Sequence, residues 1–328
     1  MRILLVKTSS LGDVVHNLPV VSDIRRNFPD ARIDWTVDGS FAEIPRMHPG
    51  IDEVISVAPR RWRRSLLSGE TWREIGAARQ KLAEHPYDTI IDTQGLIQSA
   101  VIARLASGTR VGLDWRSARE PLRVFYDRTC RVPWDRHAVE RNRLLAALAL
   151  GYPLESKVDY GIRAPVSPGD GAFWDEEIRS RPFAVLLHAT SATAKLWPED
   201  QWVRLGDHLK RSGAISVLPW GNEKERARSE RLAESIKGAI VPPRLTITEA
   251  AWLLGAALVV VGVDTGLAHL AAALGAPTVG LYVSTDPSAT GLYGAPRALN
   301  VGHPGKPPSL SEVIAAELLV TATMKASA

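Results

Sequence analysis

The stretch LVVVGVDTGLAHLAAAL, residues 258–274, decides the fold. It opens with a run of β-branched and leucine residues that is typical of a strand, and its last part predicts a helix over 267–274. Only the short loop from Gly262 to Gly266 separates the two. A strand that passes through a short loop into a helix is the repeating unit of a mostly parallel α/β sheet.

The same alternation runs through both halves of the chain. Short β-branched and leucine-rich runs alternate with longer amphipathic stretches, so we expect mostly parallel sheets with helices between their strands. The expected strands lie at residues 2–7, 32–37, 53–57, 89–93, 110–112, 183–188, 215–219, 258–261 and 278–282. The expected helices lie at residues 14–27, 71–84, 97–106, 138–150, 198–213, 223–236, 248–255, 267–274 and 310–323.

The length of the chain, 328 residues, exceeds what one hydrophobic core usually supports, so two domains are expected. The alternation breaks down between residues 151 and 182 into a segment rich in Gly, Pro and Ser, where we expect the linker. We place the boundary after residue 165, which gives an N-terminal Rossmann-like domain, 1–165, and a C-terminal one, 166–328. The helix at 310–323 could pack on either domain.

The expected fold class is therefore α/β, with two Rossmann-like domains facing across a central cleft. Ligands of open α/β sheets bind at the carboxyl ends of the strands. The loops that follow the strands are thus where we look for chemistry.

The composition excludes several classes of protein. With 45% hydrophobic and 23% charged residues, the chain is expected to bury a core and is unlike disordered sequences. The single cysteine, Cys130, cannot form an intrachain disulfide, which fits a reducing compartment. The apolar N-terminal run is too short for a signal peptide, and the apolar stretch 250–263 is shorter than the roughly 20 residues that span a bilayer.

Positive charge is concentrated in the first half of the chain. Residues 1–165 hold 25 Lys and Arg against 20 Asp and Glu, whereas the rest holds 15 against 16. This asymmetry suits an acidic partner, such as a nucleic acid, an anionic lipid or a phosphorylated substrate. No zinc-finger spacing, RNP-like signature or helix-turn-helix pattern supports nucleic acid.

The first loop whose side chains could take part in a reaction follows the opening strand and contains Ser10 and Asp13. Their spacing is that of a capping box, so starting a helix would explain both residues. Alternatively, Asp13 is a general base that takes a proton from a substrate hydroxyl. A helix N-terminus stabilises the charged carboxylate and so weakens it as a base, whereas partial burial opposes that effect. The sequence leaves both roles open.

A basic loop follows at residues 60–64, Arg-Arg-Trp-Arg-Arg. Guanidinium groups match the geometry of carboxylates and phosphates, so this loop could clamp an acidic acceptor. A run of charges is also commonly no more than a solvated surface.

Two loops of the second half are suited to an anion. After the strand at 183–188, small hydroxyl residues lead to Lys195, which could place a point charge on a phosphate. After the strand at 258–261, Asp264 and Gly266 open a helix whose free N–H groups can bind an anion, with His269 one turn further. The alternative is an exposed lysine in one loop and, in the other, a helix capped by Asp264 with His269 in the core. Glu225 could bind ribose hydroxyls or be an ordinary acid in the first turn of a helix.

Several motifs are absent from the sequence. It contains no G-x-G-x-x-G, no G-x-x-x-x-G-K-[ST] and no G-x-S-x-G, which argues against dinucleotide oxidoreductases, P-loop NTPases and serine hydrolases. No Asp-x-Asp pair is present to clamp a metal on a diphosphate, and the pair His137 and Glu140 is weak evidence for a metal site. We therefore expect no metal ligands.

Taken together, these motifs resemble the lipopolysaccharide heptosyltransferases of glycosyltransferase family 9. The resemblance covers nearly the whole chain and rests on residues 7–16, 59–64, 188–198, 218–221 and 264–269. The Lys-Thr-Ser-Ser opening and the Arg-Arg-Trp-Arg loop favour the heptosyltransferase I branch over the heptosyltransferase II branch, which shares the Gly-Asp and Asp-Thr-Gly elements.

The resemblance implies a GT-B fold and an inverting transfer of L-glycero-D-manno-heptose. The implied donor is ADP-heptose, and the implied acceptor is the first Kdo sugar of Kdo2-lipid A. ADP-heptose is a substrate, so no cofactor is implied. The enzyme is expected in the cytoplasm, docked peripherally on the anionic cytoplasmic face of the inner membrane, where the lipid-linked acceptor would be presented. Nucleic acid is not an expected partner.

The resemblance also implies roles for single residues. The aspartate that matches Asp13 is the proposed base of the family. The residues implied to contact the ADP-sugar are Thr190, Ser191, Lys195, Glu225, Leu245, Asp264, Thr265, Gly266 and His269. Those expected on the acceptor side are Lys7, Ser10, Gly12, Arg60, Arg61, Trp62, Arg63 and Arg64. The loop around Thr193 and the turn at Asn222 depart in detail from the family pattern.

Other functions stay open from the sequence. One is transfer to an already heptosylated core, as in the heptosyltransferase II branch. Another is a nonenzymatic nucleotide-binding or lipid A-binding module in which Asp13 only caps a helix. A nucleotide-sugar epimerase or other oxidoreductase is opposed by the missing glycine motif.

Overall fold

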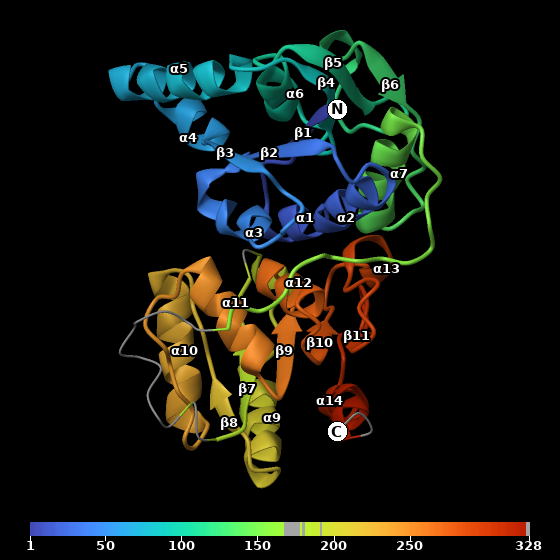
Figure 1. Ribbon diagram of the computed structural model, residues 1–328. Helices are drawn as coiled ribbons and strands as arrows, with labels where there is room; N and C mark the ends of the chain where they lie inside the picture. Colours follow the sequence, from blue (N-terminus) through green and yellow to red (C-terminus); the bar gives the residue numbers. More distant parts are fainter. Residues whose placement is uncertain (167–177, 179–180, 191, 326–328) are drawn as a thin grey trace. The chain divides into compact units, whose positions relative to one another are not determined.

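The computed structural model describes residues 1–166, 178, 181–190 and 192–325, with side chains up to residue 322 (Figure 1). The chain divides into two compact units, Met1–Ile162 and Arg163–Ala328. This division falls three residues before the boundary predicted after residue 165. Each unit has its own parallel sheet, so the predicted α/β class with two Rossmann-like sheets is confirmed.

Unit 1 is built on a six-stranded sheet in the order β3-β2-β1-β4-β5-β6. All neighbouring strands are parallel, and the order reverses beside β1, as in Rossmann folds. The strands are β1 (Arg2–Val6), β2 (Arg32–Asp38), β3 (Glu53–Val57), β4 (Tyr87–Asp92), β5 (Gly108–Leu113) and β6 (Arg128–Cys130). The loops after β1 and β4 therefore lie side by side at the reversal point.

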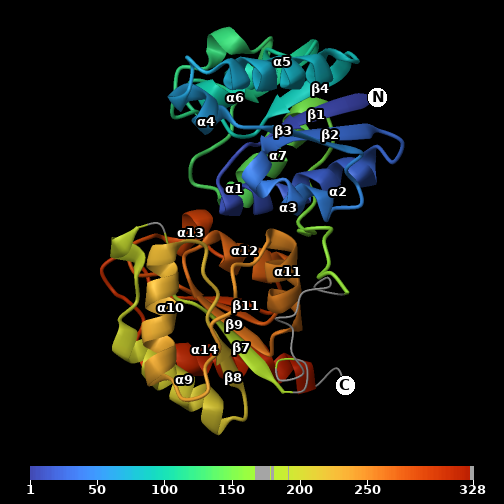
Figure 2. The same cartoon turned by 90° about the vertical axis from the view of Figure 1, so that its left-hand side faces the viewer.

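Helices cover both faces of this sheet (Figure 2). One core cluster joins Trp62, Leu82 and Ile102, so α4, α5 and α6 cover one face together, while α2 packs against α7 on the other. The helices are α1 (Leu11–Val15), α2 (Leu18–Asn27), α3 (Glu43–Arg46), α4 (Pro59–Arg64), α5 (Gly69–Ala83), α6 (Ile97–Ala103) and α7 (Ala138–Leu150). Short 3-10 turns lie at Gly39–Phe41 and Arg123–Phe125.

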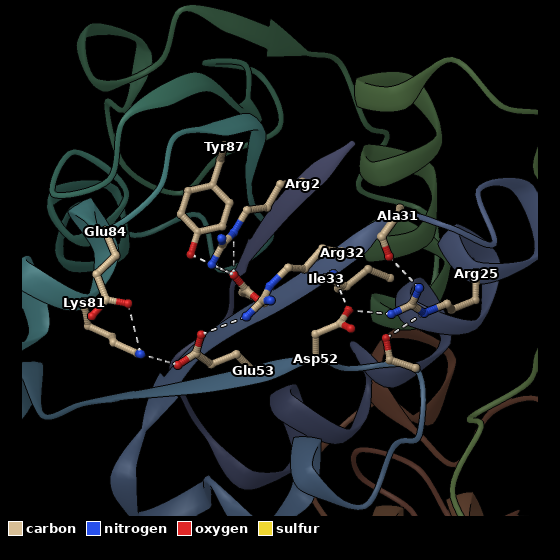
Figure 3. A network of polar contacts seen from close by, with 12 residues as sticks. Arg2, Arg25, Ala31, Arg32, Ile33, Asp52, Glu53, Lys81, Glu84 and Tyr87 are labelled. Carbon is tan, nitrogen blue, oxygen red and sulfur yellow. Dashed lines mark hydrogen bonds and ion pairs between the residues drawn. The ribbon is translucent and has the colours of Figure 1, made fainter.

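A polar network ties the strands of unit 1 near their amino ends (Figure 3). The buried carboxylate of Asp34 accepts hydrogen bonds from Arg2 at 2.8 Å and from the Tyr87 hydroxyl at 3.0 Å. The Arg2 guanidinium also lies 5.1 Å from the centre of the Tyr87 ring. A buried charge needs such partners to be tolerated. This end of the sheet therefore has a structural role and leaves the carboxyl ends available for chemistry.

Unit 2 has a five-stranded parallel sheet in the order β11-β10-β9-β7-β8. Its strands are β7 (Phe183–Leu187), β8 (Ile215–Val217), β9 (Val259–Val263), β10 (Thr278–Leu281) and β11 (Ala298–Val301). Among the described residues 181–190 and 192–325 of this unit lie the 3-10 turn η3 (Thr193–Lys195) and the helices α9 (Glu199–Arg211), α10 (Glu223–Ser235), α11 (Ile247–Ala256), α12 (Gly266–Ala273), α13 (Pro287–Thr290) and α14 (Leu310–Lys325).

The last helix packs within unit 2. Helix α14 lies against β9, β10, β11 and α9, and its Val313 and Val320 belong to the core cluster that contains Trp202. Of the two packings that the sequence left open, the structure thus has α14 on the sheet of the second unit. None of the helices within the described residues is long and apolar enough to cross a membrane.

Two local predictions are wrong. The single helix predicted over 14–27 is two helices, α1 and α2, because the chain turns at His16 and Asn17 and then restarts with Pro19 in the first turn of α2. Proline has no N–H to donate, so it suits a helix start and interrupts a helix interior. The basic segment predicted as a loop is helix α4, which likewise starts with a proline, Pro59.

Candidate active site

The loop after β1 places Asp13 in the first turn of α1. One carboxylate oxygen, Oδ2, accepts hydrogen bonds from the Ser10 N–H and hydroxyl groups, both at 2.9 Å. The capping role that the sequence allowed is therefore present in the structure. Within the described chain no hydrogen bond reaches the second oxygen, Oδ1, and Asp13 is only half-buried. Asp13 can thus cap the helix with one oxygen and accept a proton with the other. Gly12 beside it is also half-buried.

A second loop of unit 1, after β4, holds the Asp13 loop in place. The side-chain oxygen of Gln94 accepts the Thr8 N–H at 3.1 Å and the Ser9 N–H at 3.2 Å. Gln94 in turn donates its own N–H to Asp92 at 2.9 Å. Because its side-chain oxygen accepts both of these N–H groups, Gln94 holds the backbone in position just before Asp13. A lone glutamine 86 residues after Thr8 offers no sequence signal for this role.

Asp92 is the buried anchor of this arrangement. Its carboxylate is 1% exposed and accepts hydrogen bonds from the Tyr126 hydroxyl at 2.7 Å and the Ser99 hydroxyl at 2.8 Å. Burial raises the pKa of Asp92, although the bonds from Tyr126 and Ser99 oppose that shift. Asp92 thus supports the loop from within the fold.

Lys7, which is predicted to contact the acceptor, is buried in the structure. It is 5% exposed, and its ammonium donates to the Thr93 carbonyl at 3.0 Å. Burial lowers the pKa of Lys7, while the nearby carboxylates of Asp13 and Asp92 act in the opposite direction. The contact of Lys7 with the acceptor stays a prediction, since its ammonium is used within the fold.

The basic segment forms one face of α4. The side chains of Arg60, Arg61, Arg63 and Arg64 are all exposed, and Arg61 pairs with Glu74 at 2.7 Å. A cavity of about 1180 Å³ lies beside this helix, lined by Arg60, Arg61, Trp62 and Arg64 together with residues of β3, α5 and the 3-10 turn Gly39–Phe41. Cationic side chains beside a cavity suit an anionic ligand.

Trp62 does not share the exposed position of these arginines. Its side chain is 8% exposed and belongs to the core cluster under α4 and α5. Its indole N–H donates to Glu74 at 2.7 Å, on the same carboxylate oxygen that pairs with Arg61. Trp62 therefore holds α4 in place, and it also lines the cavity beside Arg60, Arg61 and Arg64, so its contact with the acceptor stays a prediction.

In unit 2, Asp264 is the centre of a polar cluster at the carboxyl ends of the strands. Its Oδ2 atom accepts hydrogen bonds from the Lys195 ammonium at 2.6 Å and the Thr285 hydroxyl at 2.8 Å. Its Oδ1 atom lies 3.4 Å from Nε2 of His269. These residues come from the loops after β7, β9 and β10 and from α12. The predicted residues Lys195, Asp264 and His269 are thus brought together.

The charge of Asp264 is fixed by these partners. Burial alone would raise the pKa of this carboxyl, but the hydrogen bonds from His269, Lys195 and Thr285 hold it well below its usual range. Asp264 therefore stays ionised at neutral pH and can hold the Lys195 ammonium beside the start of α12.

The start of α12 differs from the alternative that the sequence left open, a helix capped by Asp264. Its N-cap residue is Thr265, not Asp264, and no side chain caps it. The first N–H groups of a helix have no partner within that helix, so Gly266 and its neighbours present donors for an anion. Thr190 donates its hydroxyl to the Asp264 carbonyl at 3.1 Å, which brings the loop after β7 to the same place. Ser191, the next predicted donor contact, lies outside the described residues.

The remaining predicted donor contacts lie further along the same unit. Glu225 is in the first turn of α10, where it accepts hydrogen bonds from Gly221 N–H and from the Asn222 side chain, both at 2.8 Å. Leu245 is half-buried just before α11. The indole N–H of Trp220 donates to the Pro242 carbonyl at 2.7 Å, which ties the segments before Glu225 and Leu245 together.

The comparisons with known proteins agree on one family. The sequence profile described as Glycosyltransferase family 9 (heptosyltransferase) matches residues 75–317. Lipopolysaccharide heptosyltransferase 1 of Pseudomonas aeruginosa is 47% identical over 302 residues, which cover 90% of this chain and 82% of that protein.

Two solved structures from Escherichia coli resemble the chain over its full length. Heptosyltransferase WaaC with ADP superposes with a TM-score of 0.85 at 39% identity, covering 100% of both chains. The same heptosyltransferase with ADP-2-deoxy-2-fluoro heptose gives a TM-score of 0.81 at 38% identity, again covering 100% of both chains. The chain is therefore similar to this heptosyltransferase in sequence and in fold over its full length.

Proposed function

The chain belongs to glycosyltransferase family 9, the heptosyltransferases, and we propose that it transfers L-glycero-D-manno-heptose from ADP-heptose to the first Kdo of Kdo2-lipid A. The observation that carries this proposal is the cluster around Asp264, which holds a lysine beside the open N-terminus of α12. The likeness to heptosyltransferase structures solved with ADP and with an ADP-heptose analogue supports a diphosphate at such a site.

The donor half of the reaction is assigned to unit 2. As the bond between the heptose and ADP breaks, negative charge grows on the diphosphate. Lys195 and the N–H groups at Gly266 are fixed cationic and dipolar groups that stabilise such charge without reorganising. Asp264 keeps the Lys195 side chain in position, and Thr265, His269 and Thr190 complete the predicted donor contacts. Glu225 is assigned to the ribose hydroxyls, and Leu245 stays a predicted contact of the ADP-sugar.

The acceptor half is assigned to unit 1. The acceptor hydroxyl attacks the anomeric carbon of the heptose, the bond to ADP breaks, and Asp13 takes the hydroxyl proton. The free Oδ1 atom of Asp13 is suited to that proton, and attack opposite to the leaving group gives inversion. The arginines of α4 and the adjacent cavity bind the carboxylates or phosphates of the acceptor.

Chelation by EDTA is expected to leave the rate of transfer unchanged, because Lys195 and α12 supply the charge stabilisation in this account. Within the described residues no three His, Cys, Asp or Glu side chains gather as metal ligands. The measurement is ADP release with and without EDTA, followed by addition of Mg²⁺. A loss of activity that Mg²⁺ restores would refute a metal-independent mechanism.

Replacing Thr285 by valine is expected to weaken the use of the donor about tenfold in kcat/KM, because a hydrogen bond to a buried charged group is worth ~1.5–3 kcal/mol. The change keeps the shape of the side chain but removes the hydroxyl that donates to Asp264. Thr285→Ser keeps the hydroxyl and is the matched control. Steady-state kinetics with varied ADP-heptose measure the effect. Equal kinetics of the valine and serine variants would remove Thr285 from the donor site.

We further propose that the enzyme works at the cytoplasmic face of the inner membrane, docked peripherally on its anionic surface. The basic excess of residues 1–165 supports this location, since anionic headgroups attract lysine and arginine. The lipid-linked acceptor would be met there, whereas ADP-heptose would arrive from solution.

The direct test of the proposed function is the mass of the lipid product. Purified protein is incubated with ADP-heptose and Kdo2-lipid A, and the expected product is the acceptor with one added heptose, formed together with ADP. A parallel incubation offers an already heptosylated acceptor. Transfer to that acceptor alone would assign the chain to the heptosyltransferase II activity. Binding of ADP-heptose without any product would point to a nonenzymatic module.

A further inference from the structure

The turn between α4 and α5 exposes three large apolar side chains within seven residues. Leu67 is fully exposed, Leu66 is 51% exposed, and Trp72 on the first turn of α5 is 59% exposed. Single exposed apolar residues are common on proteins, but a cluster of large ones marks a surface that contacts a partner. We call Leu66, Leu67 and Trp72 the apolar tip.

Positive charge surrounds the apolar tip. Residues 59–73 contain five arginines and one acidic residue, Glu70. Arg61 is paired with Glu74, whereas no carboxylate of the described chain lies within ion-pair distance of Arg60, Arg63 or Arg64. Arg63 and Arg64 directly precede the turn that carries Leu66 and Leu67. The patch therefore joins exposed apolar side chains to unneutralised cations.

The structure also holds the apolar tip in place. Glu74 on α5 accepts hydrogen bonds from both Arg61 and the Trp62 indole of α4, each at 2.7 Å. This carboxylate fastens the two helices on either side of the turn. A turn that is already ordered loses little conformational freedom when it binds a partner.

The polar group of Trp72 is already hydrogen-bonded within the protein, which suits an apolar environment. Its indole N–H donates to the Leu66 carbonyl at 2.8 Å, so both polar groups are satisfied within the turn itself. Moving an unsatisfied N–H or carbonyl group into hydrocarbon is costly, and this bond removes that cost. The ring can thus leave water without losing a hydrogen bond, as tryptophans at membrane interfaces do.

We propose that the apolar tip inserts into the anionic lipid bilayer, with Arg63, the α4 arginine that does not line the acceptor cavity, on the headgroups. The pairing of apolar side chains with free guanidinium groups fits a surface that has hydrocarbon below negative charge. Because few apolar side chains insert, membrane binding is reversible. It needs both the apolar insertion and the attraction of arginine to the anionic headgroups. This inference deepens the proposed function, because it names the segment of the acceptor-binding unit that meets the membrane.

The test is flotation of the full-length protein with vesicles of phosphatidylcholine, with and without phosphatidylglycerol. Wild type is expected to float with the anionic vesicles and to be released by salt. Leu67→Glu is expected to lower this binding at least about tenfold, since it removes a leucine that the bilayer would bury and adds a charge that anionic lipid repels. Leu67→Trp keeps an interfacial side chain and is expected to float like wild type.

Val124→Glu is the matched control. Val124 is 80% exposed on a different segment of unit 1, the 3-10 turn Arg123–Phe125, so the same change of charge is made away from the apolar tip. This variant is expected to float like wild type. Thermal denaturation of all variants checks folding, which an exposed position such as Leu67 should not disturb.

Transfer assays separate this inference from the proposed function. With an acceptor freed of its acyl chains in solution, Leu67→Glu is expected to match wild type, whereas with Kdo2-lipid A in vesicles it is expected to be slower. Absence of transfer by wild type would defeat the proposed function, and flotation would still decide the membrane contact.

Three results would overturn the membrane contact. The first is equal flotation of Leu67→Glu and wild type. The second is self-association without vesicles that Leu67→Glu abolishes, which would make the apolar tip an interface between copies of the chain. The third is impaired transfer by Leu67→Glu to the deacylated acceptor, which would place the tip on the acceptor sugars.

Discussion

Replacement of Asp13 by asparagine is expected to slow heptosyl transfer by about 10³-fold, within the range that a positioned general base contributes. Asparagine has nearly the same shape, and its side-chain oxygen can still accept the two hydrogen bonds from Ser10. It cannot take a proton from the acceptor hydroxyl. This variant therefore separates the two roles that the sequence left open, the helix cap and the base.

The measurement is a single turnover with excess enzyme, quenched at set times, with ADP-heptose affinity determined in parallel. The affinity is expected to stay near that of wild type, because the donor contacts are assigned to unit 2. Ser10→Ala is a useful comparison, since it removes the hydroxyl partner of Asp13 but leaves the carboxylate. This variant is expected to slow transfer much less than Asp13→Asn. Turnover of Asp13→Asn at the wild-type rate would leave Asp13 as a cap only.

Replacement of Lys195 by methionine is expected to lower kcat/KM for ADP-heptose by about a hundredfold, comparable to the loss of one preorganised group that stabilises a charged transition state. The lysine charge is needed both when the diphosphate binds and, more strongly, when it leaves. Donor affinity and rate should therefore fall together. Lys195→Arg keeps the charge and is expected to retain part of the activity.

A second effect of Lys195→Met has to be separated from the loss of the phosphate contact. Lys195 is also a partner of Asp264, which is 8% exposed and would keep a buried charge with fewer partners. The double variant Lys195→Met/Asp264→Asn removes that charge. If it recovers stability but not kcat/KM, the kinetic loss belongs to the diphosphate. Recovery of both would assign Lys195 a structural role.

The sequence predicts the fold well where local signals agree. Helix α7 has the bounds predicted for it, 138–150, because His137 caps its start through the Val139 N–H and Gly151 ends it in the left-handed conformation with φ of 79°. The short strand β6 was not predicted, since three residues carry too little periodicity. Its pairing with β5 comes from tertiary structure.

The candidate site is less accessible to prediction. Asp264 and Lys195 are singled out by their own loops, but their 2.6 Å contact joins residues 69 positions apart, and no local pattern encodes it. Thr285 was missed for the same reason, because a single threonine after β10 is unremarkable until the fold brings it to Asp264. Burial is also invisible locally: Lys7 and Trp62, both predicted as acceptor contacts, are only 5% and 8% exposed in the structure.

Proton removal and diphosphate binding are assigned to different units of the chain. Calorimetric titration of ADP into wild type, Asp13→Asn and Lys195→Met tests this division. Asp13→Asn is expected to bind ADP with an affinity within about twofold of wild type, whereas Lys195→Met is expected to bind at least about tenfold more weakly. Weak binding by Asp13→Asn, or wild-type binding by Lys195→Met, would contradict this division.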